Sequence, residues 1–369
     1  MARSLEMVLG QVPLTSLVTA VTQGIPDPLP EGFDVVTDKV LGNSARVPRI
    51  EGTRETAKLV MYGAPAVRRS LQGIEMVDVK CLHAFEELQI DVLTMQRLRE
   101  WESYNIQGDL GVQEVARQAA VFRQRFANLR IAAKLLMLAY GKVNYDGQGN
   151  LLDPAAAVPD DGVSVDARVP AGNKDQLNIL GDGNIIAASW NTASTDIPLH
   201  VRNIIDASVK LTGYVPELAI YGKNIQSYLT KNDFVKDYLS RNPIYAQPVL
   251  TGNALPSGFL DLTWVRGYTT FFVDSGGTRR QIVGDDTVIF CPRPSPDWWK
   301  VIEGSYAVPN SINISQEQIS LAGNFTIKYG RFGYSLPCTN PISYLTYFGD
   351  TFLCWPAVPN ALIIGDVIP

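Results

Sequence analysis

The chain has 369 residues, of which 46% are hydrophobic and 19% are charged. This length allows two or three packed domains at roughly 100–200 residues each, and the composition excludes an intrinsically disordered chain. The 32 lysines and arginines against 37 aspartates and glutamates give a formal net charge of −5, which excludes a global electrostatic attraction to nucleic acid. Four scattered cysteines without a C-x-x-C pair predict reduced, mostly buried thiols of an intracellular product, with a Cys338–Cys354 disulfide as the alternative.

Residues 1–50 are expected to form an N-terminal arm. Val8–Val21 is apolar, but Gln11 and Pro13 interrupt it, which favours a short amphipathic helix over a signal peptide. Residues 25–50 are rich in proline and glycine, which favours extended chain. No stretch reaches the ~18 consecutive apolar residues that a membrane span needs.

Residues 51–90 are expected to form an extended two-stranded loop. Thr56–Tyr62 and Ile74–Leu82 alternate weakly between apolar and polar residues, and glycine and proline lie between them. A two-stranded ribbon is marginally stable alone, so it would lie on another surface such as a neighbouring subunit. Its basic residues are candidate assembly contacts: Arg54, Lys58, Arg68 and Arg69.

The longest predicted element is a helix over residues 112–140, preceded by a shorter one from about Asp91 to Tyr104. Apolar residues recur alternately three and four apart: Val112, Val115, Ala119, Phe122, Phe126, Leu129, Ala133, Leu136 and Tyr140. This spacing places one apolar seam along a rod of about 40 Å, typical of a beam in a coiled coil, a bundle or an assembling subunit. We expect the seam to pack on the C-terminal strands of the same subunit.

The opposite side of this rod is polar and includes Lys134 and four arginines, namely Arg117, Arg123, Arg125 and Arg130. Arg117 and Arg125 are candidates for the side that faces a packaged nucleic acid. A solvated face or ion pairs between subunits are the alternatives for all four arginines.

After the rod, Lys142–Tyr145 and Asn150–Leu152 flank an Asp146–Gly149 turn and predict a hairpin. A helix beginning near Pro198 and ending at Gly213 has N-cap candidates that include Asp196. A buried strand and two further helices follow, at 217–221, 224–230 and 233–240, and this order indicates an α/β domain. The remaining predicted strands are 163–169, 259–266, 269–274, 279–283, 287–291, 325–332, 343–348 and 352–355.

Catalytic and ligand-binding motifs are missing from the sequence. It has two histidines, no G-x-S-x-G elbow and no phosphate-binding G-x-x-x-x-G-K-[ST] loop. Asn144–Gly149 starts like a calcium loop, but Ala155 occupies the place of the bidentate glutamate, so a turn is the better interpretation. Trp298 and Trp299 predict a buried or interface anchor, and stacking on a sugar or a base is the alternative. No catalytic, cofactor-binding or metal-binding residue is assigned, and the chain is not expected to be an enzyme.

The order of these parts resembles the Hong Kong 97-type fold of tailed-phage major capsid proteins, and more narrowly the lambda-type major capsid protein E family. The resemblance covers about residues 30–360 and rests on the order and spacing of several short motifs. They are Gly141-Lys142-Val143, Leu152-Asp153-Pro154, Trp190-Asn191, Thr195-Asp196-Ile197-Pro198, Pro216-Glu217-Leu218-Ala219-Ile220-Tyr221-Gly222 and Gly284-Asp285-Asp286-Thr287-Val288-Ile289. Tyr221-Gly222-Lys223 stands where the family often has a Phe-Asp-Pro-like turn, which leaves the subfamily open.

This resemblance implies an α+β fold with the N-terminal arm, the extended loop and two domains. The peripheral domain would comprise residues 91–184 with the spine helix, and the axial domain residues 185–310. Residues 311–369 would supply return strands of the peripheral domain.

The resemblance also implies a function in assembly. Subunits would form the pentamers and hexamers of an icosahedral head around double-stranded DNA, with scaffold, portal and possibly decoration proteins as partners. The head would be assembled in the host cytoplasm, and the protein would end in the virion. Two alternatives remain: an encapsulin-like cellular compartment of the same fold, and a carbohydrate-active enzyme that uses the tryptophans and acidic turns.

Overall fold

The computed structural model describes residues 27–50, 74–91, 110–174, 188–251, 255–273, 277–309, 325–339 and 342–368. The helix expected at Val8–Val21, the strand expected at Thr56–Tyr62 and nearly all of the helix expected at Asp91–Tyr104 lie outside these ranges. Asp91 itself ends a strand.

A six-stranded sheet is built around one long strand, β15 (Ile342–Pro356). β15 pairs antiparallel with β4 (Leu82–Asp91), with β14 (Arg331–Thr339) and, through its last residues, with β12 (Trp299–Pro309). β1 (Val36–Val40) adds to β12 in parallel, and β13 (Phe325–Tyr329) pairs with the outer half of β12. Segments from three distant parts of the chain therefore share this sheet.

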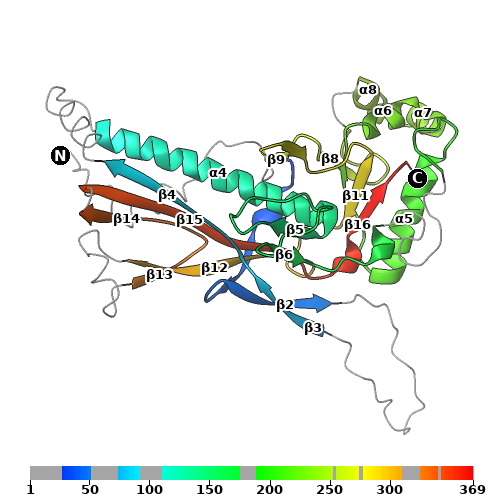
Figure 1. Cartoon of the computed structure of the whole chain (residues 1–369). Helices are drawn as coiled ribbons and strands as arrows, with labels where there is room; N and C mark the ends of the chain where they lie inside the picture. Colours follow the sequence, from blue (N-terminus) through cyan, green and yellow to red (C-terminus); the bar gives the residue numbers. More distant parts are fainter. Residues whose placement is uncertain are drawn as a thin grey trace, which may run out of the picture.

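The helix α4 (Leu110–Tyr140) lies along one side of this sheet (Figure 1). Phe122 of the predicted seam stacks on Phe348 of β15, with ring centroids 4.7 Å apart. Gly141 ends the helix with a φ of 70°, and its N–H donates to the Met137 carbonyl. The predicted helix is thus confirmed within two residues, and its seam packs on C-terminal strands of its own subunit.

A second, four-stranded sheet has the order β16-β11-β7-β8. Its strands are β7 (Leu218–Tyr221), β8 (Thr263–Arg266), β11 (Thr287–Cys291) and β16 (Ile363–Asp366). It shares a hydrophobic core with four helices, α5 (Ile197–Thr212), α6 (Ile225–Lys231), α7 (Asp233–Arg241) and α8 (Pro243–Thr251). The predicted caps of α5 are confirmed, because the Asp196 carboxylate accepts from the Leu199 N–H at 3.0 Å and Gly213 is left-handed.

The described residues also form three two-stranded ribbons. They are β2 (Ser44–Ile50) with β3 (Ile74–Lys80), β5 (Lys142–Tyr145) with β6 (Val163–Asp166), and β9 (Phe271–Val273) with β10 (Arg279–Gln281). Figure 1 shows the β2–β3 ribbon projecting from the body on the side of the sheet away from α4.

Several expectations differ from the structure because strands pair over long sequence distances. β1 and β2 lie in the segment expected as an extended arm, where they pair with β12 and β3, and β4 belongs to the six-stranded sheet and not to a two-stranded loop. The main partner of β5 is β6, whereas Leu151 makes one isolated bridge to Tyr145.

The predicted boundary near residue 310 differs as well. Residues 299–309, assigned to the axial segment 185–310, form β12 in the sheet beneath α4, and residues 363–366, assigned to the segment 311–369, form β16, which pairs with β11 in the second sheet. The chain therefore crosses from the second sheet to the six-stranded sheet before residue 299, and it returns to the second sheet after residue 356. Neither strand was predicted from the sequence.

Candidate functional site: a buried charge network and exposed contact surfaces

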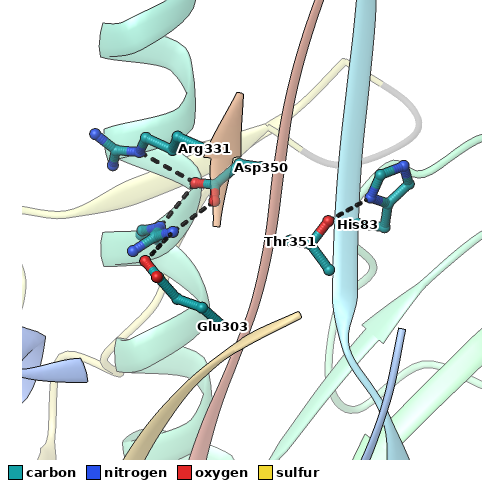
Figure 2. Close-up of polar contacts among 6 residues, drawn as sticks. His83, Glu303, Arg331, Asp350 and Thr351 are labelled. Carbon is teal, nitrogen blue, oxygen red and sulfur yellow. Dashed lines mark hydrogen bonds and ion pairs between the residues drawn. The ribbon is translucent and has the colours of Figure 1, made fainter. Parts of the chain in front are cut away.

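A network of charged side chains joins α4 to the six-stranded sheet (Figure 2). Arg130 donates to both carboxylate oxygens of Asp350, from Nε at 2.7 Å and from a terminal nitrogen at 2.5 Å. The same guanidinium lies 3.4 Å from Glu303 of β12, and Arg331 donates to Asp350 from the other side at 3.2 Å. The Asp350 side chain is fully buried, so this carboxylate depends on the two arginines for compensation.

The pKa values of the two arginines reflect their unequal positions. Burial lowers the pKa of Arg130, but Asp350 and then Glu303 outweigh this effect, and the net shift is upward. Burial lowers the pKa of Arg331, and its longer contact with Asp350 offsets this only in part. Arg130 is therefore the principal partner of Asp350, and it ties the middle of α4 to β15.

The strand β15 carries polar contacts on both sides at this point. Figure 2 shows Asp350 directed toward α4 and the next residue, Thr351, directed toward His83 of β4. His83 Nδ1 and Thr351 Oγ1 are 2.7 Å apart. Alternation along the strand thus connects α4, β15 and β4 through two adjacent residues.

A second buried cation holds the chain that leads into β1. Lys134 of α4 is 1% exposed and forms ion pairs with Asp27 and, at 2.6 Å, with Asp34. Burial lowers the pKa of Lys134, but the two carboxylates outweigh it and raise this pKa. The expectation that Lys134 lies on a polar outer face is wrong, since Ile131–Ala139 is buried on every side of the helix.

The predicted tryptophan anchor is part of the same buried region. Trp298 and Trp299 are 0% and 2% exposed and enclose Phe33 in edge-to-face contacts with centroids 6.0 and 5.2 Å apart. Of the predicted roles, a buried core and an interface anchor, the structure favours the core. An indole buried in its own subunit is also unable to stack on a sugar or a base.

The other predicted residues divide into two groups. Arg54, Lys58, Arg68 and Arg69 lie outside the described residues. Arg117 and Arg125 lie on the exposed part of α4, and Arg125 pairs with Glu86 of β4 at 2.8 Å. Arg130, by contrast, faces the interior of its own subunit, so it is not available to a nucleic acid.

Sequence reasoning missed Asp350, Glu303, Asp27 and Asp34 as partners of the helix. No local pattern identifies them, because the partners of Arg130 lie more than 170 residues away along the chain. Side chains alternate along a strand, so Phe348 and Asp350 of β15 lie on one face. The sequence alone does not show that this face packs against α4.

Exposed apolar side chains mark further candidate contact surfaces. Ile244 and Leu250 of α8 are 83% and 58% exposed. Phe325 and Ile327 of β13 are exposed, as are Phe271 and Val273 of β9. Exposed apolar side chains that gather on a surface are typical of protein contact sites.

The chemistry that these residues can supply is that of packing and ion pairing. Among the described residues, no group of three or more His, Cys, Asp and Glu side chains could hold a metal ion. Cys81, Cys291 and Cys354 are free, buried thiols, and burial raises the pKa of Cys81 to about 11 and that of Cys354 to about 12. Of the helices in the described ranges, none is apolar over a length that would cross a membrane.

Comparison with known proteins gives matches in structure. No protein-family model matches the chain, and no curated protein matches its sequence. The fold is similar to that of a phage-related protein from Bordetella bronchiseptica RB50, with a TM-score of 0.51 and 11% identity over 96% of each chain.

Two further solved structures are more distant. The candidate capsid protein of a prophage from Escherichia coli CFT073 has a TM-score of 0.47 and 14% identity, over 99% of this chain and 95% of that one. A chain of the satellite phage P4 procapsid has a TM-score of 0.44 and 10% identity, over 91% and 85%. At such identities the likeness concerns the fold alone.

Proposed function

We propose that this chain is the major structural subunit of a tailed-phage capsid, which self-assembles into an icosahedral head and catalyses no reaction. The observation that carries the proposal is the fold shared with a phage-related protein over 96% of both chains. The sequence resemblance to tailed-phage capsid proteins, which rests on separate motifs, supports the same function.

The architecture suits a shell subunit. Each subunit of a shell must keep its shape under mechanical force. Ion pairs of Arg130 hold α4 on the sheet, and ion pairs of Lys134 hold α4 against residues 27–34. Each subunit must also contact several neighbours, and exposed apolar side chains lie on α8, β9 and β13. Closed shells of identical copies are held by such repeated, modest contacts.

The finer features of the proposal follow from the resemblance. The chain would belong to the lambda-type major capsid protein E family and build pentamers and hexamers. The α5–α8 region would lie nearest the axis of each capsomer, and the sheet beneath α4 would lie at its periphery. Scaffold and portal proteins would take part in assembly in the host cytoplasm, and double-stranded DNA would be enclosed through weak, non-specific contact.

The two alternatives predict different observations. An encapsulin-like compartment would also assemble, but its particles would hold protein and no DNA. A carbohydrate-active enzyme would need accessible tryptophans, and Trp298 and Trp299 are buried.

The extended loop offers a direct test. Replacing residues 51–73 by a short Gly-Ser linker keeps β2 and β3 paired and removes the segment that would overlap a neighbour. We expect a soluble subunit with an unchanged far-ultraviolet circular dichroism spectrum and no closed shells in negative-stain electron microscopy. Normal particles from this variant would contradict the overlapping role of the loop.

A further inference from the structure

A cavity of about 320 Å³ lies at the C-terminal end of α4, where this helix meets the second sheet (Figure 1). Residues of α4 and β5 form one wall, and residues of β11 and β16 form the other. The side chains of the charge network around Arg130 and Lys134 lie elsewhere and do not line it. Its volume is at the lower end of the range of about 300–1,000 Å³ that is typical of small-molecule sites.

The floor of the cavity is apolar and buried. Ala139 comes from the last turn of α4, Ile282 follows β10, and Ile364 lies in β16. An apolar group placed on this floor would leave water and contact both the long helix and the second sheet. Such a transfer is favourable, so the floor suits the apolar body of a ligand.

Two ammonium groups border the same cavity. Lys142 begins β5, and Lys174 follows the short helix at Ala171–Asn173. Within the part of the chain that the structure describes, neither ammonium donates a hydrogen bond or forms an ion pair. Two cations thus lie beside an apolar floor without a close anionic partner.

The nearby carboxylates compensate these lysines only in part. Partial burial lowers the pKa of Lys174, Asp166 opposes this shift, Lys142 adds to it, and the net shift is downward. Asp166 also accepts from the Arg168 N–H at 2.6 Å, and Asp366, which lines the cavity, accepts from the Ile368 N–H at 3.2 Å. An anion bound beside Lys174 would stabilise its charged form.

A second role for these lysines needs no ligand. A Cβ atom at Gly141 would lie 3.7 Å from Nζ of Lys174, so this ammonium stands beside the end of α4. Cations are favourable at the C-terminus of a helix, where the backbone carbonyls concentrate negative charge. This role accounts for the position of the charges, but not for the apolar cavity that they border.

We propose that this cavity binds a small amphiphilic anion, with its acid group beside Lys142 and Lys174 and its apolar body on the floor. A carboxylate or a sulfonate supplies the acid group equally well, because both present oxygen acceptors that carry one negative charge. The bound molecule would contact α4 and the second sheet together and so stabilise their packing. The inference is independent of the proposed shell function, because the site is complete within one copy of the chain.

The test uses the full-length chain and two dyes with the same aromatic body. Anilinonaphthalene sulfonate carries an anionic group and phenylnaphthylamine carries none, and the fluorescence of both rises in an apolar site. Lys174→Gln and Lys142→Gln should each weaken binding of the sulfonate about tenfold, on the scale of one charged contact, and leave binding of the neutral dye unchanged. Decanoate should displace the sulfonate from the unaltered chain and displace it less well from Lys174→Gln.

Two further variants control for binding elsewhere on the surface. Lys231→Gln removes an exposed lysine of α6 outside the cavity and should change neither affinity. Ala155→Trp places an indole at the exposed rim of the cavity and should weaken both dyes. Dye binding that Ala155→Trp leaves unchanged would place the dye on another surface, such as α8 or β13, and overturn the proposal.

The lysine variants separate a ligand site from a purely structural role. Equal affinity of the sulfonate for Lys174→Gln, Lys142→Gln and the unaltered chain would leave the lysines with the helix end alone and overturn the site. An equal loss of both dyes in these variants would contradict the placement of the acid group. None of these outcomes depends on whether the chain forms shells.

Discussion

Removing the Arg130 side chain tests whether the charge network holds α4 on the sheet. Arg130→Met keeps an unbranched side chain with high helix propensity and deletes the guanidinium. Of its two arginine contacts, the fully buried Asp350 would keep the one with Arg331 at 3.2 Å. Breaking a buried ion pair by removing one partner costs about 3–5 kcal/mol, and the remaining arginine places the expected loss near the lower end, about 3 kcal/mol.

The same helix provides a matched control. Arg125 lies five residues earlier, is 61% exposed and pairs with Glu86 at 2.8 Å. Arg125→Met should cost about 0–1 kcal/mol, because exposed ion pairs contribute little. The expected difference of about 2–3 kcal/mol between these substitutions therefore measures the effect of burial.

Urea unfolding of the unassembled subunit, followed by tryptophan fluorescence, measures both free energies of unfolding. The buried Trp298, Trp299 and Trp355 report on the region that the network joins. Adding Asp350→Leu to Arg130→Met should recover part of the loss, because the uncompensated charge is gone. The reasoning is refuted if Arg130→Met costs no more than Arg125→Met.

Three further substitutions or conditions test other parts of the structure. The Trp190 indole donates to Nδ1 of His200 at 3.2 Å, and burial lowers the pKa of His200 although Asp196 partly opposes this. Because the unfolded state binds a proton at this histidine at a higher pH than the folded state, the free energy of unfolding should fall as the pH drops below about 6.5. The fall should be smaller in His200→Gln. An NMR titration that gives His200 a pKa above about 6.5 would contradict this. Gly349→Ala should cost about 1–3 kcal/mol, since its Cβ would lie 2.3 Å from the buried Phe332 ring, and Phe332→Leu in the same chain should relieve part of that loss in urea unfolding. Phe33→Ala should cost about 3–5 kcal/mol and expose residues 27–34 to limited proteolysis, whereas unchanged protection would show that this segment does not depend on its phenylalanine.

Elements with strong local signals were predictable from the sequence. The three- and four-residue spacing over residues 112–140 gave α4, and Asp196, Pro198 and Gly213 gave both ends of α5. In each case, the apolar spacing or the capping residues that predict the helix lie within the helix itself or beside its ends.

Features set by distant partners were not predictable in this way. β12 and β16 join different sheets although nothing near them in sequence specifies a partner. Lys134 looks like a surface residue until Asp27 and Asp34 are placed beside it. α8 was not predicted from the sequence, and it contains Pro248, a residue that usually disfavours a helix interior.

The basic residues of the extended loop and Arg117 of the spine remain predictions as contacts between subunits or with packaged DNA. They need a second copy or a nucleic acid to acquire partners of that kind.

Electron microscopy of the purified full-length chain, alone and with lysate from its source, tests the central claim most directly. We predict closed, icosahedral shells built from this chain, and particles from the source that contain double-stranded DNA. A chain that stays monomeric under both conditions, or shells that contain an enzyme and no DNA, would contradict the assignment as a phage capsid subunit.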